Sequence, residues 1–294
     1  MRAALVGAFG AVLVAGDLPP CWWWQIGSAT APVLAMDPPG VESPPGLLPR
    51  AQPSFPIRVL IDGWGIATSP VDWDAGAWTT AAAGAGAVAL GIAVADAPVQ
   101  RWSQRRTRGS DGDRAAQRIG RIGGPSGAIA MVGGFLAVGL VADDDRAQAV
   151  AADTGEAILL GSVLLTTGLK AAFGRERPRE AGDDADRFQP FGSGRSLPSG
   201  HATQAFAMAG VLSAHYPEPW IAWSAHAIAA AVAATRVQQD AHYLSDVVLG
   251  AMIGAWVAHE VTARNQARRL GTASVALAID LAGEAPALGL RLDW

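Results

Sequence analysis

The sequence predicts an all-α domain, a bundle of six helices, followed by a C-terminal β-hairpin. Three observations support this prediction. Apolar residues recur with helical spacing in six segments between residues 75 and 264. Clusters of glycine, proline or charged residues separate these segments. After residue 269 the apolar period changes to two, which is typical of strands. Half of the 294 residues are apolar and 16% are charged, which excludes a disordered chain.

Two segments are expected before the bundle. Residues 1–16 begin with Met1 and Arg2 and continue as a short apolar run, which is typical of a secretory signal peptide; an N-terminal membrane anchor is the alternative. Residues 17–56 are rich in proline and lack apolar periodicity, so they are interpreted as a linker. The domain itself is expected at residues 57–265.

The expected helices carry apolar positions that are mostly alanine and glycine. They are predicted at residues 75–95, 127–142, 146–173, 201–214, 220–235 and 244–264. The arginine-rich stretch at residues 101–121 is expected to form a loop between the first two helices. In the tail, residues 266–294, two alternating runs predict a packed β-hairpin with its turn near residues 283–286.

Lys170 is the only lysine of the chain, and every other basic side chain apart from histidine is an arginine. An ammonium is a compact point charge and a guanidinium is a planar fork, so a site fitted to one resists exchange for the other. Lys170 begins the run K-A-A-F-G-R-E-R-P. Two further motifs follow, P-S-G-H at residues 198–201 and T-R-x5-H-x3-D with Arg236, His242 and Asp246.

All three motifs occur at helix ends. The first closes the third expected helix, P-S-G-H opens the fourth, Arg236 closes the fifth, and His242 with Asp246 opens the sixth. Because neighbouring helices of an up-and-down bundle are antiparallel, these ends are expected to meet on one side of the molecule.

The side chains that would meet there suit a phosphoryl group. Lys170, Arg177 and Arg236 can neutralise its charge, the arginines through paired hydrogen bonds. Ser199 stands at a helix-cap position, so its hydroxyl and the N–H groups that follow it can donate to an anion. Gly200 would let the backbone approach the anion closely.

The two histidines can divide the chemistry. His242 and Asp246 are four residues apart, so the carboxylate can hold one imidazole nitrogen and leave the other as a nucleophile. His201 can then protonate the leaving oxygen, a task for which an ordinary histidine pKa is suited near neutral pH.

The three motifs together resemble the signature of the type 2 phosphatidic acid phosphatase (PAP2) and vanadium haloperoxidase superfamily. The resemblance implies an all-helical phosphatase that works through a phosphohistidine on His242, with His201 as general acid and Asp246 orienting His242. It implies a phosphate site made of Lys170, Arg177, Ser199, Gly200 and Arg236. Thr235 stands where the family usually has serine, which leaves a hydroxyl in place.

The expected activity is hydrolysis of a lipid phosphate, a polyprenyl diphosphate or a small phosphate ester, with no metal and no cofactor. Vanadate is expected to inhibit. A vanadium-dependent haloperoxidase, in which vanadate is the cofactor, and a non-catalytic envelope or lipid-binding protein are the alternatives. The slightly negative net charge of −4 gives no indication of a nucleic-acid partner.

The location is expected to be the periplasm or another part of the cell envelope. The helices are rich in alanine and glycine, and several contain charged residues, so a soluble or membrane-associated domain is favoured over a six-span membrane protein. The arginine-rich stretch is expected to attract an anionic substrate to its end of the bundle.

Overall fold

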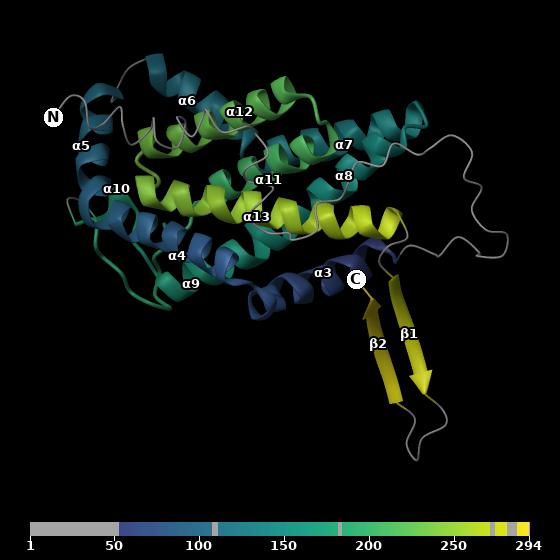
Figure 1. Cartoon of the computed structure of the whole chain (residues 1–294). Coiled ribbons are helices and arrows are strands. Elements are labelled where there is room, and N and C mark those ends of the chain that lie inside the picture. The colour runs from purple at the N-terminus through teal and green to yellow at the C-terminus, as the bar shows by residue number, and fades with distance from the viewer. Residues whose placement is uncertain (1–52, 108–110, 182–183, 271–273, 281–286, 294) are drawn as a thin grey trace.

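The computed structural model describes residues 53–107, 111–181, 184–270, 274–280 and 287–293 (Figure 1). Its helices are α3 (Phe55–Thr68), α4 (Ala75–Leu90), α5 (Asp96–Thr107), α6 (Asp111–Ile122), α7 (Pro125–Val141), α8 (Asp145–Ala157), α9 (Thr166–Phe173), α10 (Pro178–Ala181), α11 (Gly200–His215), α12 (Pro219–Gln238) and α13 (Leu244–Arg269). The predicted signal peptide and nearly all of the predicted linker lie outside the described residues.

The predicted count of six helices is wrong for this part of the chain. The helix predicted at residues 75–95 is longer than expected, because a π-helical segment joins α4 to α5. A second π-helical segment joins α8 to α9 within the helix predicted at residues 146–173. The short helices α3, α6 and α10 were not predicted. The arginine-rich stretch was expected to be a loop, but it contains most of α5 and α6. Helix α6 was not predicted because its apolar positions are few and lie on one narrow face.

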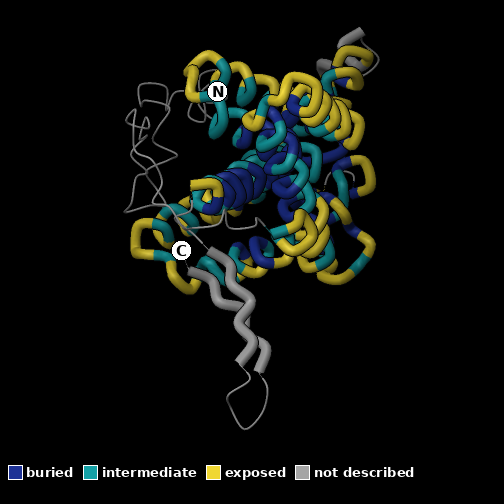
Figure 2. Tube along the Cα trace, turned by 90° about the vertical axis from the view of Figure 1, so that its right-hand side faces the viewer, coloured by how far each residue is buried: buried dark blue, intermediate teal, exposed yellow. Residues whose placement is uncertain are grey.

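Helices α11 and α13 contain more buried residues than any other helix, and buried residues gather along the centre of the bundle (Figure 2). Small residues explain their close packing. A Cβ on Gly254 would lie 2.2 Å from the carbonyl oxygen of Thr203, and one on Gly210 would lie 2.7 Å from the Cβ of Ala258. The alanine and glycine content therefore serves helix contact, and valines such as Val211 and Val257 fill the core beside it.

A buried polar network fixes the end of the bundle that contains the C-terminus of α13. Arg268 donates to both carboxylate oxygens of Asp62 on α3. Asp153 on α8 accepts from the side-chain amide of Asn265 at 2.9 Å and contacts the imidazole of His215 at 2.8 Å. Helices α3, α8, α11 and α13 are thus joined by charge-assisted hydrogen bonds.

Strands β1 (Ser274–Asp280) and β2 (Ala287–Asp293) pair antiparallel, with Ser274 opposite Asp293. The predicted turn at residues 283–286 lies outside the described residues. Among the described residues these two strands make a sheet of their own, and the fold class of this part of the chain is set by its helices.

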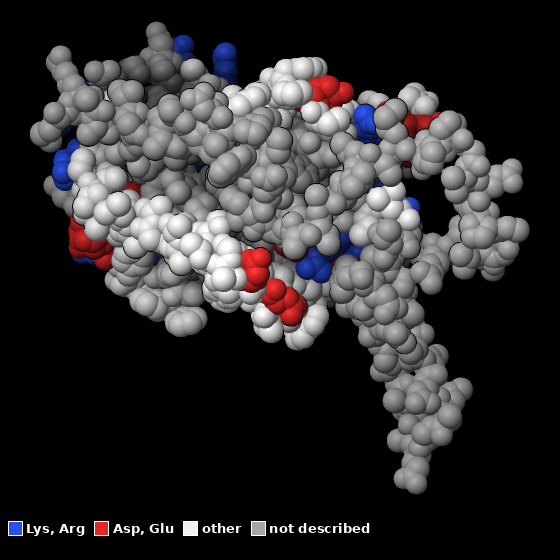
Figure 3. Space-filling view, viewed as in Figure 1, with Lys and Arg blue, Asp and Glu red and all other residues white. Residues whose placement is uncertain are grey.

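Much of the lateral surface is apolar. Within the described residues, three helices are long and apolar enough to cross a membrane, Ala75–Arg105, Asp145–Phe173 and Leu244–Arg269, and a fourth span is possible if the bent pair α6 and α7 is counted as one. Large side chains such as Leu60, Trp64 and Leu140 are exposed. The surface of α4 shows no charged side chain (Figure 3). These surfaces support membrane association and weigh against the preference for a soluble domain.

Candidate active site

The structure places the three motifs at one end of the bundle. Lys170 lies in the last turn of α9 and Arg177 follows it before α10. His201 lies in the first turn of α11, Arg236 in the last turn of α12, and Asp246 in the first turn of α13. Ser199 links the second and third motifs directly, because its backbone N–H donates to the carbonyl of Asp246 at 2.9 Å.

Lys170 binds the segment that leads into the P-S-G-H motif. Its Nζ donates to the carbonyl oxygens of Arg195 and Ser196, at 2.6 and 3.3 Å. An ammonium has three N–H donors, so one remains for a ligand. Gly174, in the left-handed conformation with φ of 58°, ends the helix four residues after Lys170 and turns the chain toward Arg177.

Ser199 stands at the N-cap of α11 but does not cap it through its side chain. Its hydroxyl is buried and has no hydrogen-bond partner among the described residues. A Cβ added to Gly200 would find ordinary contacts, 3.8 Å from the side chains of Ser162 and Thr166. The helix N-terminus and the serine hydroxyl are therefore available to an anion.

His242 and Asp246 form a buried pair. Nδ1 of His242 lies 3.6 Å from Oδ2 of Asp246, beyond hydrogen-bond length but close enough for the carboxylate to orient the ring. Burial lowers the pKa of His242 to about 4. The carboxylate of Asp246 raises this pKa in part, and the positive charges of Lys170 and Arg177 lower it further. His242 is therefore neutral near pH 7, and one nitrogen of its ring keeps a lone pair.

Arg175, which sequence reasoning missed, holds Asp246 from the other side. Its side chain is fully buried. One terminal nitrogen donates to Ser245 Oγ and Asp246 Oδ1, both at 2.7 Å, and the other donates to Asp96 Oδ2 at 2.7 Å. The ring of Tyr243 lies 4.2 Å from the guanidinium carbon. Arg175 thus connects α5 to the first turn of α13 by a network of paired charges.

Two more groups fix the carboxylate of Asp246. The hydroxyl of Ser196 and the backbone N–H of Tyr243 both donate to Oδ2, the latter at 2.9 Å. Asp246 has no exposed surface. Its orientation is therefore determined by three donors, counting the guanidinium of Arg175.

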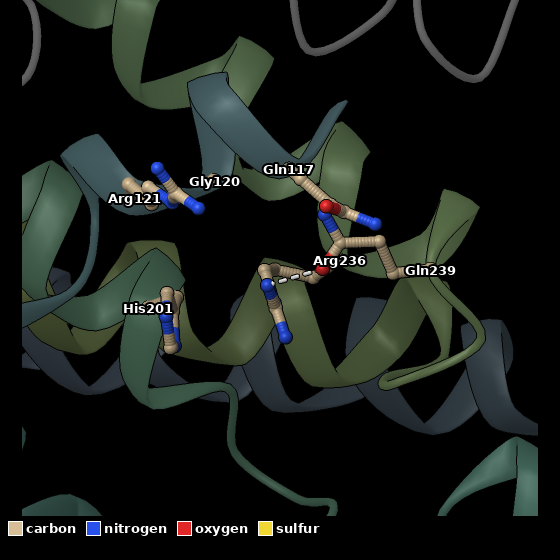
Figure 4. Close-up of a pocket in the computed structure, with 6 residues that line it drawn as sticks. All are labelled: Gln117, Gly120, Arg121, His201, Arg236 and Gln239. Atoms are coloured by element: carbon tan, nitrogen blue, oxygen red, sulfur yellow. Dashed lines mark hydrogen bonds between the residues drawn. The ribbon is translucent and has the colours of Figure 1, made fainter. Parts of the chain in front are cut away.

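His201 and Arg236 line a pocket of about 200 Å³ that opens beneath α6 (Figure 4). The other lining residues are Gln117, Gly120, Arg121 and Gln239. Arg236 donates to the side-chain oxygen of Gln239 at 2.6 Å, and its Nε is buried without a partner among the described residues. Helix α6, absent from the predicted helices, is thus part of the site.

The pKa of His201 departs from the ordinary value that the sequence suggested. Burial, and then the positive charge of Arg236, lowers it to about 4, with further contributions from His242, Lys170 and Arg177. These contributions show that the groups of all three motifs are close enough to affect one another. They also mean that His201 is neutral near pH 7 until negative charge enters the site.

The loop at residues 179–197 supports the site through backbone carbonyl groups. Within its described residues, Ala185 accepts from Arg175, and Arg195 and Ser196 accept from Lys170. None of them lines the pocket beside His201. The residues that line this pocket come from α6, from the start of α11 and from the end of α12.

Four buried polar atoms of the motifs have no hydrogen-bond partner among the described residues. They are Arg177 Nε, Ser199 Oγ, Arg236 Nε and His242 Nδ1. Unpartnered buried polar atoms are rare in folded proteins because each costs free energy. Arginine and serine can both donate, and arginine carries positive charge, so the arrangement is suited to an oxygen-rich anion.

Curated relatives match part of the chain. A lipid A 1-phosphatase from Rhizobium johnstonii is 41% identical over 100 residues, and one from Rhizobium etli is 40% identical over 100 residues. Each match covers 32% of this chain, and 40% and 42% of the respective relative. The chain therefore spans about two-fifths of the length of these relatives.

One solved structure is similar over a longer range. A transmembrane PAP2-type phosphatidylglycerolphosphate phosphatase from Bacillus subtilis is 20% identical, with a TM-score of 0.46, and the match covers 72% of this chain and 94% of that one. A family model described as the PAP2 superfamily matches residues 154–270, which contain all three motifs. Residues 154–270 are therefore similar to the PAP2 superfamily.

Proposed function

We propose that the protein is a membrane-associated phosphatase that hydrolyses a lipid phosphate through a phosphohistidine on His242. One observation carries this proposal: the four unpartnered buried polar atoms in the three motifs, three of which can donate to a phosphate. The phosphate would be bound by Lys170, Arg177, Ser199, Gly200 and Arg236.

In the first step, the lone pair of His242 Nε2 attacks phosphorus, and the bond to the leaving oxygen breaks. His201 gives its proton to that oxygen. The negative charge of the bound phosphate opposes the effect of Arg236 and raises the pKa of His201, so that the imidazole can carry this proton. Asp246 stabilises the positive charge that develops on His242.

In the second step, water attacks the phosphohistidine and returns its proton to His201. The N–P bond breaks, inorganic phosphate leaves, and His242 is neutral again. Neither step needs a metal ion or a redox cofactor, and vanadate should inhibit because it can take the place of the transferred phosphoryl group.

A lipid is the substrate class that the apolar surface supports. A phosphate attached to a hydrocarbon anchor partitions into the bilayer, and a protein with three long apolar helices meets it there. The two Rhizobium relatives, both lipid A 1-phosphatases, support a lipid phosphate as well. We place the protein in the membrane of the cell envelope, with the end that holds His201 and Arg236 at the bilayer surface.

The test is phosphate release by purified protein in detergent, with lipid phosphates as substrates. His242→Ala should reduce the rate by at least about 1,000-fold, because the nucleophile is lost. His226→Ala, on α12 and hydrogen-bonded to the carbonyl of Ala222, is the control and should keep the activity. A His242→Ala protein that releases phosphate at the wild-type rate would refute the proposal.

A further inference from the structure

The pocket beneath α6 lies where a leaving group would depart. The nucleophile and the leaving oxygen stand on opposite sides of phosphorus in phosphoryl transfer. His242 is 3% exposed, whereas His201 borders the open pocket. If His201 protonates the leaving oxygen, as the proposed function requires, the atoms next to that oxygen enter the pocket.

The pocket is lined by polar groups. Its six lining residues include two amides, Gln117 and Gln239, and two guanidinium groups, Arg121 and Arg236; none is acidic and none has an apolar side chain. Within the described part of the chain, the guanidinium of Arg121 makes no ion pair or hydrogen bond. A hydrocarbon in this position would displace water from these groups without replacing its hydrogen bonds.

Close contacts fix α6 against the reacting residues. A Cβ on Gly120 would lie 3.3 Å from a terminal nitrogen of Arg236, and one on Gly124 would lie 3.1 Å from Nε2 of His201. The side-chain amide of Gln204 donates to the carbonyl of Gly124 at 2.6 Å. The glycines therefore bring α6 and the turn after it against the site, and Gln117 and Arg121 lie across the pocket from His201 and Arg236 (Figure 4).

We infer that Gln117 and Arg121 bind the leaving group, and that this group carries oxygen atoms next to the scissile bond. A second phosphoryl group or a sugar ring has this chemistry, and a bare alkyl or prenyl chain does not. The inference rests on the proposed function and narrows its substrate class to lipid diphosphates or glycosyl phosphates. A guanidinium favours the phosphoryl group, and an amide favours the sugar hydroxyls.

Three substrates test this inference on the full chain in detergent: farnesyl diphosphate, an N-acylglucosamine 1-phosphate, and farnesyl monophosphate. For each, kcat/KM of Arg121→Ala and Gln117→Leu is divided by the wild-type value, which removes intrinsic differences in leaving-group reactivity. We expect a loss of at least about 10-fold on one or both oxygen-rich substrates, the effect of one charge-assisted hydrogen bond, and less than about 2-fold on farnesyl monophosphate.

Arg118→Ala is the matched control, because Arg118 is an exposed arginine of α6 that does not line the pocket. A larger loss on the diphosphate than on the sugar substrate identifies a phosphoryl leaving group, and the reverse identifies a sugar. The inference would be overturned if kcat/KM fell equally on all three substrates or fell on none. It would also be overturned if Arg118→Ala showed the same pattern of losses. Wild-type protein that hydrolyses only farnesyl monophosphate would overturn it and leave the proposed function intact; wild-type protein that hydrolyses none of the three would count against both.

Discussion

At the scale of single residues, the position of Asp246 depends on Arg175, a side chain within the first motif to which the sequence assigned no role. Arg175 lies two residues before Arg177, and its partners Asp96 and Ser245 are 79 and 70 residues away in the sequence. A lone arginine gives no sign of such distant partners. The motifs predicted which residues gather at the site, but the contacts that hold them required the packed structure.

Arg175→Lys should lower kcat by at least about 100-fold and change KM little, because an ammonium cannot contact Asp246, Ser245 and Asp96 together. Steady-state kinetics on a lipid phosphate measure both constants. Arg187→Lys is the control, since Arg187 forms an exposed pair with Glu176. Wild-type kcat in a folded Arg175→Lys protein would show that Asp246 needs no such support.

The pH dependence follows from the lowered pKa of His242, about 4 in the free protein. The imidazole must be neutral to attack phosphorus, so activity is present above this pKa and is lost as the pH falls through it. The pH profile of kcat/KM should therefore have an acid limb with an apparent pKa near 4, rather than near the ordinary value of about 6.5. An acid limb near 6.5 would mean that His242 is not the buried nucleophile.

At the scale of elements, helix α6 is the main departure from prediction. Only four of its twelve residues are apolar and three are arginine, so the segment was interpreted as a charged loop although its apolar residues share one face. The long helices were found because alanine, glycine and valine repeat over many turns. The glycines at the end of α6 have a tertiary reason: a Cβ on Gly123 would lie 2.3 Å from Val232 and 2.8 Å from the carbonyl oxygen of His201.

Gly123→Ala should reduce both thermal stability and kcat, the latter by about 10-fold or more, because the added methyl must displace α12 or the backbone of His201. Unfolding temperature and kinetics in detergent measure the two effects. Gly86→Ala is the control, because a Cβ there meets open space on α4. Equal behaviour of the two variants would contradict the close approach of the α6–α7 turn to His201.

At the scale of the whole molecule, the two ends of the bundle have different polar networks. Asp246 and Arg268 lie at opposite ends of α13, about 33 Å apart by the helical rise. The network around Arg268 joins four helices and includes none of the motif residues. It was not predicted, because Asp62 lies 206 residues before Arg268 in a segment assigned no helix.

Asp62→Asn should lower the free energy of unfolding by about 3–5 kcal/mol, since it removes the buried carboxylate that Arg268 contacts. The unfolding temperature in detergent should fall, and kcat of the protein that remains folded should change by less than about 2-fold. Asp72→Asn, at an exposed carboxylate, is the control. An unchanged unfolding temperature would show that the Asp62–Arg268 pair contributes little to stability.

The most direct test of the central claim is to trap the phosphoryl group on His242. Wild-type protein mixed with a ³²P-labelled lipid phosphate and quenched in alkali should carry acid-labile, alkali-stable label, and peptide mapping should place it on the peptide that contains His242. His242→Ala should carry none. Label on another residue, or phosphate release without any labelled protein under single-turnover conditions, would contradict a phosphohistidine mechanism.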